Sequence, residues 1–254
     1  AGNETKDTPA DIPADFTGPS ITIDPIGTAN DDGVINIAES GGSLEITGAT
    51  NLVEPGQPIT VTVNGVTLAG PITVGADGTW TATATSGELS GLPANGTVTV
   101  TANVSDLVGL AAPQATAQVD TDLEAPTISI DTPIAGDDVI NIVEQGEALQ
   151  ISGTTTGVED GQEVTVTLVN GTTTVTTSAT TVTGGIWSTD IPASDLSGLS
   201  GDLALDVTAD VSDAAGNPAP QASEPLATDL TPPTIAFDAI SGDNQIGLLD
   251  VQGD

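Results

Sequence analysis

Apolar and polar side chains alternate along much of the chain, and this period of two predicts half-buried β-strands. Residues 97–104 place Thr or Asn between the apolar positions Val98, Val100, Ala102 and Val104. The same alternation returns at 205–211. Further strands are expected at 21–23, 44–47, 59–63, 66–68, 79–85 and 115–119. No window of a dozen residues keeps the apolar spacing of an amphipathic helix, so the pattern indicates an all-β protein.

Turn signals separate these strands and suggest their arrangement. Asn64-Gly65 and Asp77-Gly78 are typical hairpin turns. About seven short strands in roughly 105 residues, with turn signals every 8 to 12 residues, favour an immunoglobulin-like (Ig-like) β-sandwich. Trp80 and Trp187 each lie in the middle of an expected strand without a second aromatic residue nearby, which favours core positions over ligand platforms.

The whole unit is repeated. Asp24, Asp131 and Asp238 recur at an interval of 107 residues, and Trp80 and Trp187 have the same separation. A constant period of this size indicates tandem domains, each large enough to bury its own core. We therefore expect a tail at 1–18, Ig-like domains at 19–125 and 126–232, and the beginning of a third domain at 233–254, stacked in an extended rod. A strand donated by 233–254 to another chain is an alternative reading of that last segment.

Composition restricts the class of function. The chain has 36 acidic residues and one basic residue, Lys6, for a formal net charge of −35, which disfavours nucleic acid and anionic membranes as partners. It contains no Cys, so no disulfide stabilises the sandwiches, and its 37% hydrophobic content is too high for a disordered acidic tail. No apolar run is long enough for a membrane span.

Enzymatic readings have little support in the sequence. General acid-base and nucleophilic catalysis draw chiefly on His, Cys, Lys and Tyr, and the chain offers one Lys and none of the others. A glycosidase would need two acids across a cleft, usually with aromatic platforms, but the aromatic residues are only two Trp and two Phe. We therefore predict a protein that is not an enzyme.

The repeated motifs resemble a known family. The phrase VDTD-LEAP-TISID, followed by GDDVIN and Glu144, and the loop VSDAAGNPAP at 211–220 are similar to the tandem bacterial Ig-like repeats of very large, biofilm-associated and often type I-secreted (RTX-type) surface adhesins. The resemblance covers 19–254. It implies an extracellular location on the bacterial surface, calcium at or near domain junctions, neighbouring repeats as partners, and extension instead of catalysis. Any host or surface ligand would then bind through other domains.

The residues support calcium independently of that resemblance. Ca²⁺ takes six to eight oxygen ligands from carboxylates, carbonyls and Asn side chains. Three clusters supply them: one after the opening strand, one at the end of the last strand, and one in the loop before that strand, where Gly216 permits a tight turn. The candidate ligands are Asp31, Asp32, Asn36, Glu39, Asp120, Asp122, Asp131, Asp137, Asp138, Asn141, Glu144, Asp213, Asn217 and Asp229, with Asp243 in the third unit.

Sandwich topology predicts which clusters meet. The last strand ends at the far pole of its domain, whereas the loop between strands six and seven lies at the near pole of its own domain. Asp120 and Asp122 should therefore approach Asp213 and Asn217, across a linker of three residues. The cluster at 31–39 would join that site or form one of its own.

Two alternatives stay open. Acidic loops are also typical of plain solvated surface, so the acidic clusters are either exposed surface residues or calcium ligands. In function, the leading hypothesis is a calcium-stiffened stalk. A ligand-binding module is the alternative, with the Thr-rich faces at 172–177 and 180–183 as candidate surfaces for a glycan, a crystal surface or a protein.

Overall fold

The computed structural model describes residues 18–26 and 33–237, and the chain divides into two compact units. The first unit consists of residues 1–127 together with the segments 155–162 and 211–220. The second consists of 128–154, 163–210 and 221–254. The expected ligands Asp31, Asp32 and Asp243, and most of the expected third domain, lie outside the described residues.

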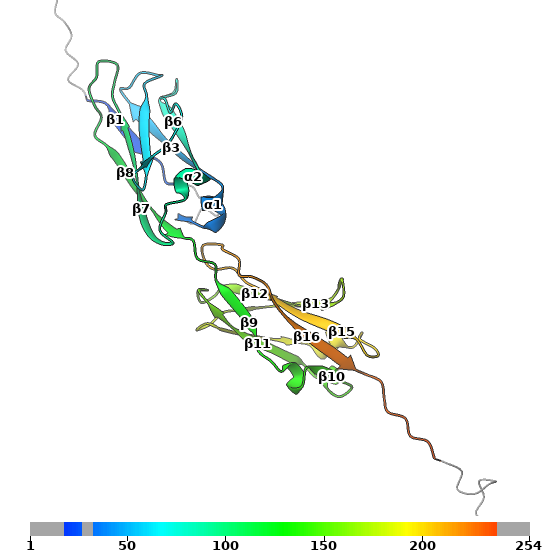
Figure 1. Ribbon diagram of the computed structural model, residues 1–254. Helices are drawn as coiled ribbons and strands as arrows, with labels where there is room; N and C mark the ends of the chain where they lie inside the picture. Colours follow the sequence, from blue (N-terminus) through cyan, green and yellow to red (C-terminus); the bar gives the residue numbers. More distant parts are fainter. Residues whose placement is uncertain (1–17, 27–32, 238–254) are drawn as a thin grey trace, which may run out of the picture. The chain divides into compact units, whose positions relative to one another are not determined.

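The first sandwich is built from a three-stranded and a five-stranded sheet (Figure 1). Its elements are β1 (Ser20–Ile23), β2 (Val34–Ile35), α1 (Ile37–Gly41), β3 (Ser43–Asn51), β4 (Ile59–Val63), β5 (Val66–Thr67), β6 (Thr79–Thr85), α2 (Ser86–Leu89), β7 (Asn95–Val104) and β8 (Ala115–Asp122). One sheet has the order β1-β3-β6, and the other β2-β8-β7-β4-β5. All pairs are antiparallel except β2 with β8.

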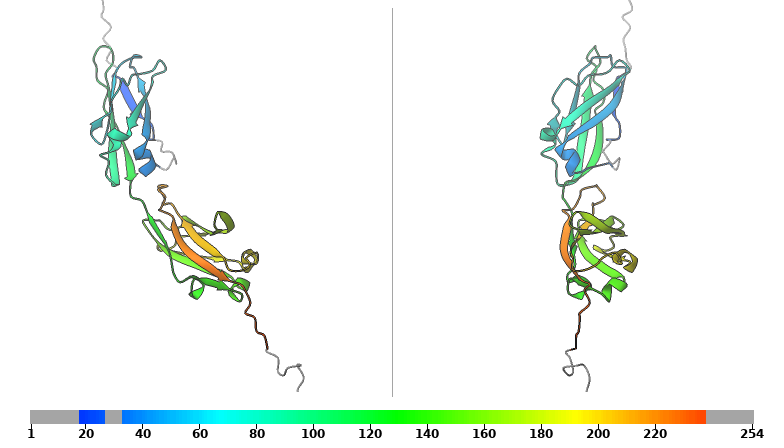
Figure 2. Two further views of the ribbon diagram at one scale, coloured as in Figure 1. Left: turned by 45° about the vertical axis from the view of Figure 1, so that its right-hand side comes forward. Right: turned by 90° about the vertical axis from the view of Figure 1, so that its right-hand side faces the viewer.

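The second sandwich repeats this topology, and its strands can be followed from two further sides in Figure 2. Its elements are β9 (Thr127–Ile130), η1 (Ile134–Gly136), β10 (Val139–Asn141), η2 (Glu144–Gly146), β11 (Leu149–Thr156), β12 (Glu163–Asn170), β13 (Thr173–Thr181), β14 (Ile186–Ile191), α3 (Ala193–Leu196), β15 (Ala204–Asp210) and β16 (Ala222–Asp229). The sheets are β14-β11-β9 and β10-β16-β15-β12-β13, with β10 parallel to β16.

The fold class is therefore confirmed as tandem all-β, Ig-like sandwiches. Each has eight strands in the described residues where about seven were predicted, because the opening segment contributes one strand to each sheet. No helix in the described ranges has the length and apolar character that crossing a bilayer requires.

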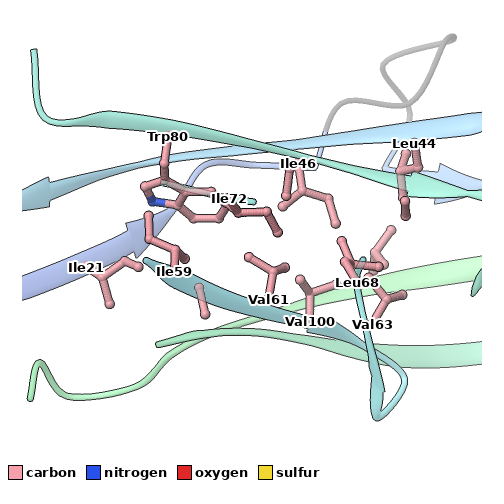
Figure 3. Packing of buried hydrophobic residues seen from close by; sticks show 14 of the residues in the cluster. Ile21, Leu44, Ile46, Ile59, Val61, Val63, Leu68, Ile72, Trp80 and Val100 are labelled. Carbon is pink, nitrogen blue, oxygen red and sulfur yellow. The ribbon is translucent and has the colours of Figure 1, made fainter. Parts of the chain in front are cut away.

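The alternating side chains form the core between the two sheets. Val98, Val100, Ala102 and Val104 on β7 are all buried, as the period of two predicts. Figure 3 shows the indole of Trp80 among apolar side chains that include Ile21, Ile59 and Ile72. Trp80 is 2% exposed and Trp187 1% exposed. The interpretation of both residues as core side chains is confirmed.

A glycine opposite each tryptophan makes room for the indole. Gly48 on β3 pairs with Trp80 on β6, and Gly153 on β11 pairs with Trp187 on β14. A Cβ added at Gly48 would lie 2.0 Å from the carbonyl oxygen of Thr22 and 2.5 Å from the Trp80 ring. Sheet and ring therefore approach each other more closely than any side chain at this position allows.

Short helices, which the sequence pattern did not predict, follow the second strand of each sandwich. α1 begins after Asn36, whose side chain accepts a hydrogen bond from Glu39 N, while the Glu39 carboxylate accepts from Asn36 N. This reciprocal capping box satisfies backbone N–H groups that a helix start leaves without partners. α1 and α2 lie together at one end of the first sandwich (Figure 1).

Candidate functional site

The loop 212–218 is held together by a buried carboxylate and a buried amide. Asp213 is 3% exposed and Asn217 1% exposed. Asp213 Oδ1 accepts from Asn217 N at 2.7 Å, and Asp213 Oδ2 accepts from Asn217 Nδ2 at 3.0 Å. Gly216, at φ +83°, donates its N–H to the carbonyl of Asp213. Both side chains are thus used to build the loop and to present its tip.

The tip of this loop contacts the end of β8 and the start of α1, within the first compact unit. Asn217 Nδ2 donates to the carbonyl of Asp122 at 3.1 Å, and Asn217 Oδ1 accepts from Ile37 N at 2.8 Å. Asn36 Nδ2 donates to the carbonyl of Ala215 at 2.9 Å. Four of the residues selected from the sequence, Asn36, Asp122, Asp213 and Asn217, are therefore brought together.

Acidic side chains gather beside this contact. Asp122, Glu124 and Glu159 line an open pocket of about 350 Å³, whose other lining residues are Asn95, Ala125, Thr127, Thr156 and Gly157. Burial raises the pKa of the Asp122 carboxyl, and the charges of Asp213, Glu159 and Glu124 raise it further, against one lowering hydrogen bond from Glu124 N. Asp122 is thus a partly buried carboxylate among like charges.

This arrangement gives stability a specific pH dependence in the absence of metal. A carboxyl whose pKa is higher in the folded state binds more protons there than in the unfolded chain, so stability falls as pH rises through that range. We expect Asp122→Asn to raise the melting temperature in chelator at pH 7, and this gain to shrink as the pH falls through the raised pKa of Asp122 toward its ordinary value of 3.8. Paired thermal melts measure the difference, with Asp190→Asn, an exposed acid on β14, as control. Equal gains at both pH values would contradict it.

The carboxylate and carbonyl oxygens around Asp122 are the types of ligand that Ca²⁺ prefers. They are not gathered into a closed set of ligands. Among residues 18–26 and 33–237, no group of three or more His, Cys, Asp or Glu side chains is close enough to hold a metal ion. The chain's one base, Lys6, lies outside those ranges, so no basic side chain of the described residues neutralises the pocket.

The other sequence-predicted ligands serve the backbone locally. Asn141 Oδ1 accepts from Glu144 N, and Glu144 Oε2 accepts from Asn141 N, which is the pairing that Asn36 and Glu39 make in the first sandwich. Asp137 accepts from Val139 N, and Asp138 from Ile134 N. These bonds give the Asn and Glu of the repeated motif a local structural role.

Three further candidates lie on strands or beside them. Asp120 accepts from the Thr97 hydroxyl, and Asp131 from the Ser152 hydroxyl. Asp229 is exposed at the end of β16 and pairs in register with Asn141. The structure therefore brings Asp122 together with the loop 212–218. Asp120, Asp131 and Asp229 instead have partners on neighbouring strands.

The sequence reasoning missed Glu159 and Glu124. Glu159 lies in a Val-Glu-x-Gly-Gln motif at 158–162 that also occurs at 53–57, so the repeat contained the signal. The function of this motif becomes clear only in the fold, where Glu159 accepts from Ala214 N and Glu54 accepts from Leu107 N. Each Glu fastens one loop between the last two strands of a sandwich.

Comparison with known proteins finds similar solved structures but no similar family or curated sequence. No family model and no curated protein matches the sequence. Among solved structures, the chain is 30% identical, with a TM-score of 0.56, to a Ca²⁺-stabilized adhesin that helps an Antarctic bacterium reach out and bind ice. That match covers 90% of this chain and 54% of the adhesin structure, so the chain spans about half of its length.

A second solved structure comes from a 1.5-MDa bacterial ice-binding adhesin. It is 26% identical, with a TM-score of 0.50, over 89% of this chain and 70% of that one. Both relatives are adhesin domains of non-enzymatic kinds of fold. The resemblance to the tandem Ig-like repeats of large bacterial adhesins, which the repeated motifs first indicated, is thereby confirmed.

Proposed function

We propose that this chain is a stalk segment of a large bacterial surface adhesin, outside the cell, whose consecutive Ig-like domains, 19–125 and 126–232, are stiffened by calcium. The observation that carries the proposal is Asp122. Its carboxylate is partly buried beside Asp213, Glu159 and Glu124, and no base of the described chain compensates these charges. Two like charges about 4 Å apart repel by roughly 1 kcal/mol even in water, so a divalent cation between such carboxylates would convert a cost into stability.

The residues available to hold the cation are those around the pocket. Asp122 and Glu159 line it from two different segments of the chain, and Asp213 lies close enough to raise the pKa of Asp122. The amide of Asn217 is already committed, because its Nδ2 and Oδ1 bond to Asp122 O and Ile37 N. We therefore assign Asn217 to bridging and the carboxylates of Asp122 and Glu159, with backbone carbonyls, to the cation, since both Asp213 oxygens already accept hydrogen bonds from Asn217. Calcium stabilisation of the 30% identical adhesin supports the choice of cation.

Calcium titration with thermal melts tests the site. For extracellular modules with dissociation constants of roughly 10⁻⁴–10⁻³ M, about 10 mM calcium should add about 1.4–2.7 kcal/mol to the free energy of unfolding. We expect Asp122→Asn to remove most of this increment while raising stability in chelator. Asp190→Asn should keep the increment of the unsubstituted chain.

Small-angle scattering of the same samples tests the stalk. We expect calcium to narrow the distribution of interatomic distances in the unsubstituted chain, and the Asp122→Asn chain to give the same curve in calcium and in chelator. If calcium changes neither the melting temperature nor the scattering curve of either chain, the acids are solvated surface residues and the proposed role of the cation is wrong.

A further inference from the structure

The first sandwich joins its entering and leaving segments through one short parallel pair of strands. β2 pairs with β8, with Val34 opposite Asp120 and Ile35 opposite Thr121. Tension along the chain reaches β2 from its amino-terminal side and β8 from its carboxyl-terminal side. Because the strands are parallel, this tension slides them past each other in opposite directions, so their hydrogen bonds are stretched together instead of one after another. The resistance of the pair therefore depends on the number of bonds that join it.

The side chain of Asn217 adds a connection just beyond the last of these residue pairs. Ile37, two residues after the end of β2, donates its N–H to Asn217 Oδ1 at 2.8 Å. Asp122, the last residue of β8, accepts at its carbonyl oxygen from Asn217 Nδ2 at 3.1 Å. Asn36 Nδ2 donates a further bond, at 2.9 Å, to the carbonyl of Ala215 in the same loop. Within the first compact unit, the loop therefore links the end of β2 to the end of β8.

Burial and a second anchor strengthen this connection. Asn217 is 1% exposed and Asn36 5% exposed, so water has little access to their bonds and cannot readily replace them. Asn217 is also held from within its own loop, because its N–H donates to Asp213 Oδ1 at 2.7 Å and its Nδ2 donates to Asp213 Oδ2 at 3.0 Å. The amide therefore cannot turn to follow one strand while the other strand moves away.

We propose that Asn217 is a mechanical bridge, which joins the ends of β2 and β8 and thereby raises the resistance of the first sandwich to tension along the chain. In the sequence, loop 212–218 lies between β15 and β16, which are strands of the second sandwich. The first sandwich thus reaches its full resistance only while these two strands hold the loop in shape. The inference rests on the proposed stalk function, because a stalk carries tension. It needs no calcium, since every bond of the bridge is formed by the protein itself.

Single-molecule pulling in chelator tests the bridge, because the chain has no Cys and handles can be attached at two introduced cysteines. Gly18→Cys with Ala125→Cys, both at exposed positions of the full chain, applies force along β2 and β8 and leaves the second sandwich without load. We expect Asn217→Leu to shorten the lifetime of the first sandwich at constant force by about 10-fold or more, since about 1.4 kcal/mol for a lost bond is tenfold in rate. Equal lifetimes with and without the substitution would overturn the proposal.

The direction of the force provides a matched control. Thr67→Cys with Gly91→Cys, also exposed, applies force to β5, β6 and α2 but to neither β2 nor β8. In this direction Asn217→Leu should change the lifetime by less than about 2-fold, because the bridge does not carry the force. An equal shortening in both directions would mean that Asn217 stabilises the fold in general, and would exclude a bridge.

Two further variants separate mechanical resistance from stability. Leu68 is a buried residue beside β5, at the opposite edge of the sheet from β2, and Leu68→Ala should destabilise the sandwich about as much as Asn217→Leu. Under force along β2 and β8 it should nevertheless change the lifetime by less than about 3-fold. Asn36→Asp keeps the acceptor for Glu39 N and removes the donor to Ala215 O, so it should shorten that lifetime by about 3-fold or more. A larger effect of Leu68→Ala than of Asn36→Asp would contradict the bridge.

Failure of the bridge and failure of the proposed function give different results. If calcium changes melting and scattering but Asn217→Leu leaves the lifetimes in chelator unchanged, the calcium-stiffened stalk stands and the bridge is wrong. If the lifetimes depend on Asn217 along β2 and β8 while calcium has no effect, the bridge stands and the role of the cation is wrong.

Discussion

Replacing Gly48 with alanine is expected to destabilise the first sandwich by about 3 kcal/mol, at the upper end of the range for overpacked cores. The added Cβ would lie 2.0 Å from the carbonyl oxygen of Thr22, which belongs to the neighbouring strand β1. A carbonyl in a paired strand cannot rotate away as a side chain can. Movement of the Trp80 indole, 2.5 Å from the same Cβ, would relieve only part of the clash and would disturb the packing in Figure 3.

The repeat supplies an internal replicate and matched controls. Gly153 has the same contacts with Ser129 O, at 1.9 Å, and with Trp187, so Gly153→Ala should cost about as much in the second sandwich. Gly91 and Gly198 have no heavy atom within 4 Å of an added Cβ and no positive φ. Gly91→Ala and Gly198→Ala should therefore change stability by less than about 1 kcal/mol. Urea unfolding of the four variants measures this, and equal midpoints for Gly48→Ala and Gly91→Ala would contradict the interpretation.

The strands were predictable because one simple physical rule governs them. Each sheet buries one face, so apolar residues must alternate, and β4 and β6 begin and end at the predicted residues. The predicted strand at 66–68 is shorter in the structure, where β5 ends at Thr67 and Leu68, the next residue, is buried in the core. The end of such a strand depends on where the chain turns, and the alternation of apolar and polar residues does not predict that position.

The function of the Asn-x-x-Glu motif was harder to predict. Asn36 and Glu39 have oxygen atoms suited to a cation, and the same atoms suit the N–H groups of a helix start. The sequence offered no means of choosing between these partners, because α1 has five residues and no apolar stripe of its own. In the structure the capping bonds are present, which explains why the spacing is the same at Asn141 and Glu144.

Sandwich topology was enough to expect Asp122 near Asp213 and Asn217, but it did not identify the bonding atoms. The side chain of Asn217 contacts the backbone carbonyl of Asp122 and not its carboxylate. Backbone partners of this kind are invisible to residue patterns, since every residue has a carbonyl. Glu159 also acts on the Asp122 carboxylate, although it lies at no strand end that the topology would bring to that site.

Asn217→Leu is expected to lower the free energy of unfolding by about 3 kcal/mol, because it leaves Ile37 N–H, Asp122 C=O and a carboxylate oxygen of Asp213 without their partner. The loop itself should keep its shape. Leu110 occupies this position in loop 105–111, and its N–H still donates to Asp106 Oδ1 at 2.8 Å. The loss should therefore fall on the contact of the tip with α1 and β8.

Amide hydrogen exchange locates that loss. In the Asn217→Leu chain we expect the Ile37 amide to exchange about 10- to 100-fold faster, since one bond of 1.4–2.8 kcal/mol no longer protects it. The Glu39 amide is the internal control, because it donates to Asn36 Oδ1 and not to Asn217. An Ile37 amide that exchanges at the original rate would show that Asn217 Oδ1 is not its acceptor. Faster exchange at Ile37 and Glu39 together would mean that α1 unfolds as a whole, and that the tip of loop 212–218 holds the helix start in place instead of bonding one amide.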